Sequence, residues 1–455
     1  MTAADVSTWT QRYRDALEPG VIRERAEVRG AVKQDLSGMQ IEVACNALEL
    51  GLRAVHLVNA QAEAIVRAEI ERALAHAIRV YSEPGAVLRA VYGEMDPVDP
   101  YMPTLVTGPA GVGKSRLLLT MRRVLFGNRQ ISIDASHAEV PLRDYSECVI
   151  GEQQSVAAVL RPLASPEVAR GRVRVKQGDM PWECARWQHI SGVCSLGVDE
   201  LQFMAQSENA TTLITRTLLA LGNIRIPWFF CANYSLCWKL LARPQEALQR
   251  LLSRPVVVLP DPPDSDDWSA LLAEYQIVLR DAIECELKDH RVELWNLCAG
   301  LKRELVKLLV HGYRTARHSG QVKMSWTHVK RAFESLEFSI PRQDINLLIA
   351  HAGQGGKLRK DLSCPFSGPE LISRRAAYEQ QLRSAREGQV AKASVASAMN
   401  AEERRAFEKI EKSSKPAETA PAQVIPFKRG KRQSFEELFE AAQRKRESLG
   451  RVPQT

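Results

Sequence analysis

The sequence predicts an α/β fold in which helices cover both faces of a parallel sheet. Short apolar runs alternate with helical segments after residue 104, and the first run leads directly into a glycine-rich loop. Strands buried on both faces read as unbroken apolar runs, and their alternation with helices is typical of a parallel sheet. The strand-like runs are TLVTG (104–108), QISIDA (130–135), CSLGV (194–198), IPWFFCAN (226–233) and PVVVLP (255–260).

Composition excludes several classes of protein. The 455 residues are 45% hydrophobic and 25% charged, which is ordinary for a globular chain of two or three domains. No apolar run approaches the ~20 residues that a membrane span needs, and the first residues lack the pattern of a secretory signal. We therefore expect no membrane partner.

The cysteines indicate a reducing compartment. There are nine, an odd number, and none forms a CxxC pair. Cys184, His189 and Cys194 are close in sequence, but their spacing fits no zinc template. We interpret the cysteines as structural thiols and expect a cytoplasmic protein.

The glycine-rich loop has the pattern of a Walker A motif, Gly108-x4-Gly113-Lys114-Ser115. Its glycines let backbone N–H groups close on phosphates, and the dipole of the following helix favours an anion. Lys114 then reaches the β- and γ-phosphates, and the Ser115 hydroxyl binds Mg²⁺. The motif predicts that ATP and Mg²⁺ bind here; the alternative is a fortuitous glycine-rich turn. The expected nucleotide ligands are Gly108, Pro109, Ala110, Gly111, Val112, Gly113, Lys114, Ser115 and Arg116.

Polar residues at two later strand ends complete a hydrolytic site. In SLGVDELQF (195–203), Asp199 can hold Mg²⁺ through water, and Glu200 can deprotonate the attacking water. This pair favours hydrolysis over phosphate transfer, against the alternative of a solvated strand end. Asn233 ends the next strand and can position the water or the γ-phosphate, unless it is only a turn residue.

Cations further along the chain are candidates for contacts to the γ-phosphate. Arg250 and Arg254 are expected on a helix just before the last strand, where an arginine can act on a neighbouring subunit's nucleotide. Surface salt bridges are the alternative for both. Arg303, or less favourably Lys302, opens a helix of the following all-helical block and can contact the γ-phosphate from there.

In this order of motifs the chain resembles the AAA+ ATPases. Within them, residues 227–268, GVDELQ (197–202) and RQDINLLIAHAG (342–353) are similar to the TnsC/TniB group, the ATP-dependent target-selection regulators of transposons. The resemblance covers about residues 90 to 360. It implies that Lys114 and Ser115 bind nucleotide and magnesium, that Asp199 and Glu200 form Walker B, and that Asn233 is the first sensor.

The resemblance also implies partners. Members of the group assemble with ATP into rings or filaments on double-stranded DNA, and they pass target information from a DNA-binding or guide-dependent partner to a transposase. Residues 136–190 are long and irregular for a minimal AAA+ core, and no DNA-contacting loop can be aligned there. A helicase or replication loader of the same superfamily, or a scaffold that binds ATP and scarcely hydrolyses it, are the alternatives.

The tail has a different composition from the rest of the chain. From Phe366 onward there are 18 Lys/Arg against 12 Asp/Glu, so most of the net charge of +8 lies there. Ser434 and Glu437 form a capping box before an apolar stripe of Phe435, Leu438, Phe439 and Leu449. This predicts a helix over 434–450, either packed on its own domain or docking on another protein from a long tether.

These features divide the chain into six expected parts. They are an N-terminal helical region (1–85), the AAA+ α/β core (86–262), a helical lid (263–340) with a break at Gly300, a post-lid segment (341–387), a flexible linker (388–433) and the amphipathic tail helix (434–455).

Overall fold

A computed structural model of the chain describes residues 3–82, 85–94, 99–131, 139–151, 155–199, 210–354, 357–399 and 403. Residues 1–395 form one compact unit and residues 396–455 a second. The fold below is that of the first unit. None of the helices in the described ranges is long and apolar enough to cross a bilayer.

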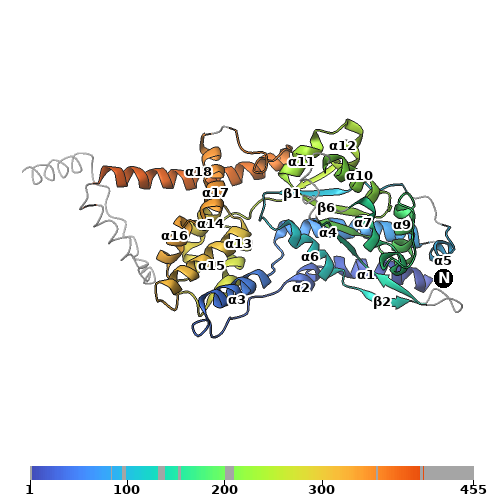
Figure 1. The fold of residues 1–455 in the computed structure, drawn as a ribbon, viewed down its shortest axis with the longest axis horizontal. Helices are drawn as coiled ribbons and strands as arrows, with labels where there is room; N and C mark the ends of the chain where they lie inside the picture. The colour runs from blue at the N-terminus through green and yellow to red at the C-terminus, as the bar shows by residue number, and fades with distance from the viewer. Residues whose placement is uncertain are drawn as a thin grey trace, which may run out of the picture. The chain divides into compact units, whose positions relative to one another are not determined.

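A five-stranded parallel sheet lies at the centre of the core (Figure 1), as predicted. Its order is β4-β5-β6-β1-β7, and every neighbouring pair is parallel. The strand before the phosphate loop, β1, therefore lies between β6 and β7, which is the arrangement of the AAA+ P-loop fold. The strands are β1 (Thr104–Gly108), β4 (Ser146–Val149), β5 (Leu196–Asp199), β6 (Trp228–Asn233) and β7 (Arg254–Val257).

One predicted strand does not belong to this sheet. The described residues of the run at 130–135, Gln130 and Ile131, belong to β2 (Asn128–Ile131), which pairs antiparallel with β3 (Val140–Arg143) in a separate two-stranded ribbon. Asn128, Arg129 and Gln130 are polar, so β2 lacks the apolar residues that a strand buried on both faces requires. The edge position is taken by β4, whose short sequence SECV did not indicate a strand.

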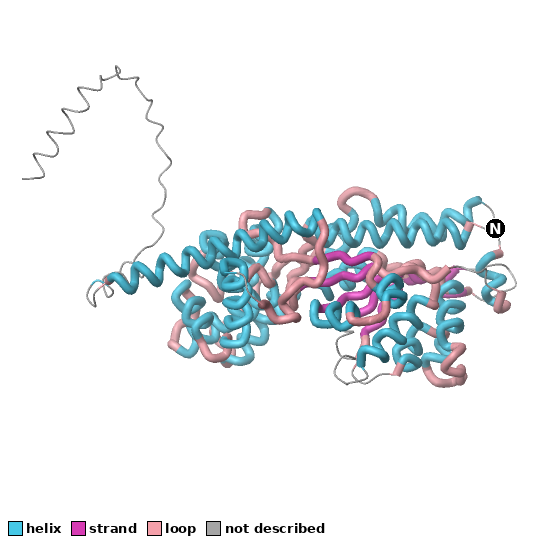
Figure 2. The backbone as a smooth tube through the Cα atoms, turned by 90° about the horizontal axis from the view of Figure 1, so that it is seen from above, coloured by secondary structure: helices cyan, strands magenta, loops and turns pink. Residues whose placement is uncertain are grey.

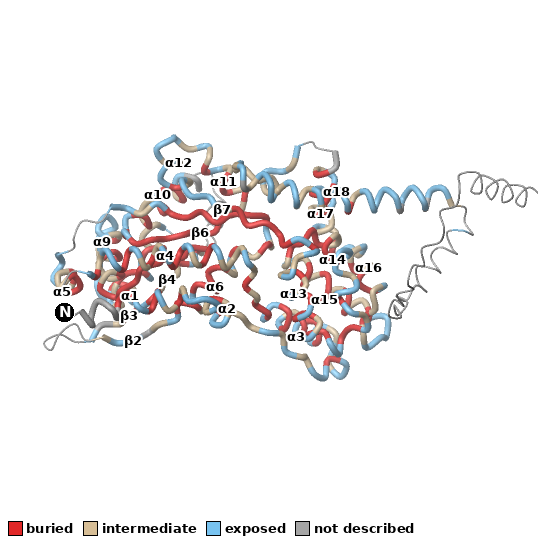
Figure 3. Tube along the Cα trace, turned by 180° about the vertical axis from the view of Figure 1, so that it is seen from behind, coloured by how far each residue is buried: buried red, intermediate tan, exposed pale blue. Residues whose placement is uncertain are grey.

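Helices pack on both faces of the sheet (Figure 2). Alternate residues of β6 divide between the faces: Trp228 and Phe230 belong to one apolar core, and Phe229 and Cys231 to the other. Figure 3 shows β6 as almost wholly buried. The first face is covered by α7 (Val156–Leu160), η1 (Arg161–Leu163), α8 (Pro166–Ala169), α9 (Met180–Ile190), α10 (Ala210–Gly222), α11 (Tyr234–Leu241) and α12 (Gln245–Leu251).

The helices of residues 1–85 divide between two apolar cores. The second face of the sheet is covered by α1 (Ala3–Leu17), α2 (Val21–Ala26), α4 (Ala60–Tyr81) and α6 (Lys114–Val124). By contrast, α3 (Ile41–Ala54) contributes Cys45, Leu48 and Leu52 to the core of the lid. The remaining short helix, α5 (Ala86–Val91), packs beside α9, where Arg186 donates to Val91 O at 2.8 Å.

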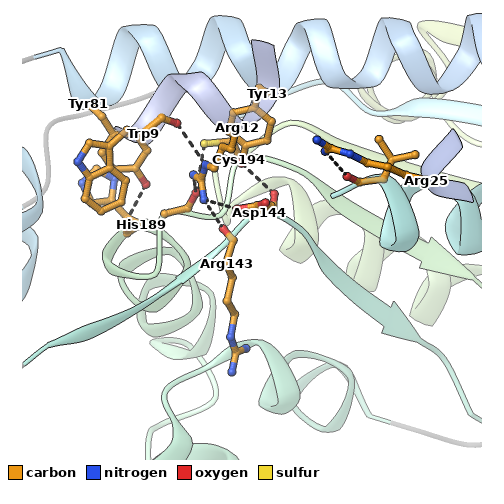
Figure 4. A network of polar contacts seen from close by, with 11 residues as sticks. Trp9, Arg12, Tyr13, Arg25, Tyr81, Arg143, Asp144, His189 and Cys194 are labelled. Carbon is orange, nitrogen blue, oxygen red and sulfur yellow. Dashed lines mark hydrogen bonds and ion pairs between the residues drawn. The ribbon is translucent and has the colours of Figure 1, made fainter. Parts of the chain in front are cut away.

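A buried polar network fastens α1 to the core (Figure 4). The Arg12 guanidinium donates to Asp144 Oδ1 at 2.7 Å, to Arg143 O at 2.9 Å and to Gly192 O. Tyr13 donates to Asp144 O at 2.8 Å. Arg12 and Asp144 are both buried, so each charge depends on the other for its compensation.

The lid is built of helices, which fits the predicted fold class, and it extends past residue 340 to the end of α17. Ser265 caps its first helix by accepting from Trp268 N at 3.2 Å, and the break at Gly300 has a positive φ of 70°. The helices are α13 (Asp266–Leu279), η3 (Leu287–His290), α14 (Arg291–Cys298), α15 (Lys302–His318), α16 (Trp326–Glu334) and α17 (Ser339–Gln354).

The chain returns from the lid to the core and back along α18 (Pro369–Ala398). Phe366 and Leu371 pack on the core residues Tyr234 and Val257, whereas Tyr378 donates to Ala299 O in the lid at 3.2 Å. The linker predicted from residue 388 is therefore helical as far as Ala398, because 389–398 are Ala-rich and contain neither proline nor glycine. Apart from Met399 and Glu403, the rest of the linker lies outside the described residues, as does the tail helix at 434–450.

Candidate nucleotide-binding site

The phosphate loop joins β1 to α6, and its glycines are required by its backbone. Gly111 and Gly113 have φ values of 87° and 118°, which strain any L side chain. A Cβ on Gly108 would overlap the carbonyl of Val258 in the neighbouring chain segment, whereas the space beside Gly113 is open. The N-terminus of α6 is thus left free of side chains on the side where an anion would bind.

Lys114 is the first residue of α6 and is buried. Its ammonium donates to Gly108 O at 2.9 Å and to Pro109 O at 3.0 Å. Burial lowers the pKa of Lys114 to about 8, with a further decrease from Arg303, against which Cys231 and Asp199 act. Among the described residues, the buried ammonium is bound by loop carbonyls alone. A polyanionic ligand would compensate its charge more fully.

A cavity of about 420 Å³ opens beside this loop, a volume within the range of small-molecule sites. Among the predicted site residues, its wall includes Gly111, Val112, Gly113, Lys114, Ser115, Arg116, Asp199, Asn233 and Arg303. Gly108, Pro109 and Ala110 belong to the loop but not to the wall. Residues separated by nearly 200 positions in the chain therefore converge on one space.

Two strand ends bring their polar residues to this cavity. Asp199 is the last residue of β5 and is largely buried, and Asn233 is the last residue of β6. Asn233 is in register with Gly108 on β1, which places it beside the phosphate loop. Ser115 and Asp199 supply the hard oxygen atoms that Mg²⁺ prefers, so these two residues could hold the ion. Glu200 lies outside the described residues.

The lid closes directly onto the phosphate loop. Arg303 N donates to Gly111 O at 3.3 Å, and a Cβ on Gly111 would lie 3.0 Å from the Arg303 Cβ. Within the described ranges Arg303 forms no ion pair, whereas Lys302 pairs with Asp261 at 3.0 Å. Of the two predicted lid cations, Arg303 is thus the one left available for a phosphate.

The other end of the cavity is formed by a segment that the sequence did not reveal. Residues 53–59, here called the strap, comprise the end of α3 and the link to α4, within the region 1–85 that was predicted to be helical. The strap pairs with Val28 through two backbone hydrogen bonds of His56, at 2.8 and 2.9 Å. The only local signal was Asn59, which caps α4 by accepting from Ala62 N at 2.9 Å. Together with Ile65, Leu271 and Tyr275, the strap lines the apolar end of the cavity, where a nucleoside base would fit.

Arg116 holds the strap against α6. Its guanidinium donates to Val55 O and to His56 Nδ1, each at 3.2 Å, and to Arg53 O. With Nδ1 as acceptor, His56 donates from Nε2 to Thr120 Oγ1 at 2.9 Å. Burial and the charge of Arg116 lower the pKa of His56 to about 4, so the ring is neutral at pH 7. The structure therefore places the Arg116 side chain on the strap, at the end of the loop away from Gly108.

The two candidate trans arginines lie away from this cavity. Arg250 is on α12, 4.0 Å from Glu246. Arg254 was predicted on the same helix, but α12 ends at Leu251 and Arg254 is the first residue of β7. The physical reason is Pro255, because a residue that precedes proline is driven out of the helical region. Both arginines are exposed.

No protein-family model matches the sequence, and no curated protein matches it. Solved structures do resemble it. ORC2 of Aeropyrum pernix in its ADP form aligns with a TM-score of 0.41 and 14% identity, over 81% of this chain and 83% of that chain. The RuvB Holliday junction branch migration motor of Thermotoga maritima aligns with a TM-score of 0.32 and 11% identity, over 60% of this chain and 74% of that chain. The fold class stands on the strand order and phosphate loop of this chain itself.

Proposed function

We propose that this chain binds Mg²⁺–ATP in the cavity between the phosphate loop, the strap and the lid, and hydrolyses it. The observation that carries the proposal is the convergence of Lys114, Ser115, Asp199, Asn233 and Arg303 on one space. Four parts of the chain contribute these residues, which a fortuitous glycine-rich turn would not require. Bound Mg²⁺ would neutralise phosphate charge next to Ser115 and Asp199.

The residues then have distinct roles in hydrolysis. Lys114 leaves its loop carbonyls for the β- and γ-phosphates, and Arg303 contacts the γ-phosphate from the lid. Asn233 orients a water in line with the γ-phosphorus, and Glu200 accepts its proton. The new bond joins the water oxygen to phosphorus, the bond to the β-phosphate oxygen breaks, and ADP and inorganic phosphate leave.

Two substitutions test this assignment. Lys114→Ala should abolish nucleotide binding, because the loop loses the positive charge that reaches the β- and γ-phosphates. Glu200→Gln should keep binding but abolish turnover, since Asp199 and Lys114 still hold the nucleotide. Equilibrium binding and phosphate release measured side by side separate the two variants. Unchanged turnover in Glu200→Gln would remove the residue from the mechanism.

We also propose that the protein regulates DNA transposition. The similarity of residues 197–202, 227–268 and 342–353 to the TnsC/TniB group supports this. In this proposal ATP drives assembly of a ring or filament on double-stranded DNA in the cytoplasm, and hydrolysis times its disassembly. The oligomer links a target-selection protein or guide-dependent complex to the transposase.

Subunit mixing tests the oligomer. If Arg250 or Arg254 completes a neighbour's site, mixing Glu200→Gln subunits with Arg250→Ala or Arg254→Ala subunits should alter turnover in a way that neither variant shows alone. If both arginine variants keep assembly and turnover, neither arginine completes a neighbour's site. Capture of a helicase instead of a transposase would favour a replication loader.

The tail provides a separate test of the partner. Deleting residues 434–455 should spare ATP turnover and DNA binding but abolish recruitment of the transposase. The apolar stripe is expected to dock, and a long tether raises its effective concentration near the partner. Recruitment that survives the deletion would show that the tail does not mediate it.

A further inference from the structure

We propose that the loop between α8 and α9, residues 170–179, binds the phosphate backbone of duplex DNA. The proposal deepens the function above by naming a contact surface, and it rests on that function for the identity of the partner. None of the loop residues lines the nucleotide cavity, so the surface is separate from the hydrolytic site.

The first observation is a concentration of unpaired positive charge. The stretch 161–179 carries five cations against the acids Glu167 and Asp179. All five cations are exposed, and none forms an ion pair with another described residue. They are Arg161, Arg170, Arg172, Arg174 and Lys176.

Several arginines elsewhere in the fold have internal partners, which the loop cations lack within the described residues. Arg12, Arg29, Arg72, Arg116 and Arg317 all donate to a carboxylate or a backbone carbonyl elsewhere in the chain. A surface that only keeps a protein soluble mixes both signs of charge. An arginine-rich stretch without internal partners is instead the electrostatic pattern of a surface that meets a polyanion.

The second observation is that the backbone of the loop is fixed. Glu167 O accepts from Arg172 N at 2.8 Å and from Val173 N at 3.2 Å, and Lys176 O accepts from Asp179 N at 3.0 Å. The side chain of Val175 packs against the apolar core beneath the loop. Both ends and the middle are therefore held, so less conformational entropy is lost when the cations bind phosphates.

The chemistry favours phosphate contacts over contacts to bases. Residues 170–179 contain no aromatic side chain on which a base could stack. Arginine and lysine contacts to phosphate position a protein on DNA without reading its sequence. We therefore expect the loop to bind duplex DNA irrespective of sequence and with a strong dependence on salt.

The test compares two triple variants that remove the same charge. Arg172→Ala/Arg174→Ala/Lys176→Ala removes the loop cations, and Lys288→Ala/Arg291→Ala/Arg331→Ala removes three exposed cations of the lid. Anisotropy titrations with a duplex of mixed sequence at several salt concentrations give the affinity and its salt slope. The loop variant should bind at least about tenfold more weakly, and its slope should fall by about 2 to 3, because each lost phosphate contact reduces the slope by about 0.9. The lid variant should retain both values, and both variants should keep the ATP turnover measured without DNA.

The remaining outcomes separate the two levels of the proposal. If the wild-type protein binds no duplex, its proposed action on DNA is overturned, whereas ATP turnover is judged independently. If the wild type binds and the loop variant matches it in affinity and slope, only the loop assignment is overturned. Trp182 is half-exposed on α9 and could stack on a base. If Trp182→Leu weakens binding of single-stranded DNA more than the loop variant weakens binding of duplex, base stacking replaces backbone contact and the proposal is overturned.

Discussion

At the scale of single residues, Lys114 has an environment that makes nucleotide binding sensitive to pH. Its ammonium is buried against two loop carbonyls, and its pKa is lowered to about 8. Only the charged form attracts the β- and γ-phosphates. Below pH 8 the ammonium is mostly charged, whereas above pH 8 binding must first restore its proton.

We therefore expect the dissociation constant for ATP to rise by about twofold from pH 7 to 8 and by about fivefold more from pH 8 to 9. A fluorescent ATP analogue titrated over this range measures the effect. AMP is the matched control, because it lacks the β- and γ-phosphates that Lys114 is proposed to contact and should show no such slope. Equal pH dependence for ATP and AMP would contradict the assignment.

Gly111, Gly113 and Lys114, which the sequence placed together in one loop, also lie together in the wall of the cavity. Gly111, Gly113 and Lys114 form a motif whose backbone requirements are local, so its geometry can be read from a short stretch. Asp199 and Asn233 followed from one further rule, that parallel strands end at one edge. The strap could not be predicted, because its position depends on Arg116 and Val28, contacts set by the tertiary fold.

At the scale of elements, α6 and the strap form one unit through Arg116. Arg116→Ala should weaken ATP binding by about tenfold, because the strap loses the hydrogen bonds that hold it at the cavity. Inorganic tripolyphosphate should bind as before, since it needs no base site. Competition titrations with both ligands measure this, with Arg122→Ala on the exposed side of the same helix as control. A parallel loss for tripolyphosphate would mean that Arg116 contacts phosphate instead.

The attachment of α1 depends on the Arg12–Asp144 pair. Arg12→Met should destabilise the protein by about 3–5 kcal/mol, because it leaves the Asp144 carboxylate buried without its cation. The double variant Arg12→Met/Asp144→Asn should recover much of that loss. Urea unfolding of both proteins gives the comparison, and a single variant as stable as wild type would show that α1 is held by apolar packing alone.

The strand predictions failed where the position of a strand in the sheet decides its composition more than its own apolar pattern does. The run at 130–135 was apolar enough to suggest a core strand, yet the edge position belongs to β4, with its mixed sequence Ser146–Val149. An edge strand is covered less completely, so it need not be apolar throughout. Arg254, by contrast, was predictable, because the proline after it already excludes a helix.

At the scale of the whole molecule, the lid and the core are interleaved along the chain. The lid core contains Leu48 and Leu52 of α3, and the sheet is covered by α1, α2 and α4. A fragment limited to residues 86–340 should therefore be insoluble or bind no ATP, because both apolar cores lose a side. Residues 1–399 should unfold cooperatively and bind ATP like the full chain. Cooperative unfolding of 86–340 would contradict this.

The placement of α3 also has a consequence for how the protein is made. Leu48 of α3 packs in the same core as Leu308 of α15. The ribosome therefore synthesises α15 long after α3 has emerged. At about 5–20 residues per second, that interval is on the order of tens of seconds. During this interval the apolar side of α3 has no native partner to pack against. The strands on which α1, α2 and α4 pack are also not yet complete. Synthesis of this chain therefore passes through a prolonged stage in which general chaperones have an apolar helix to bind.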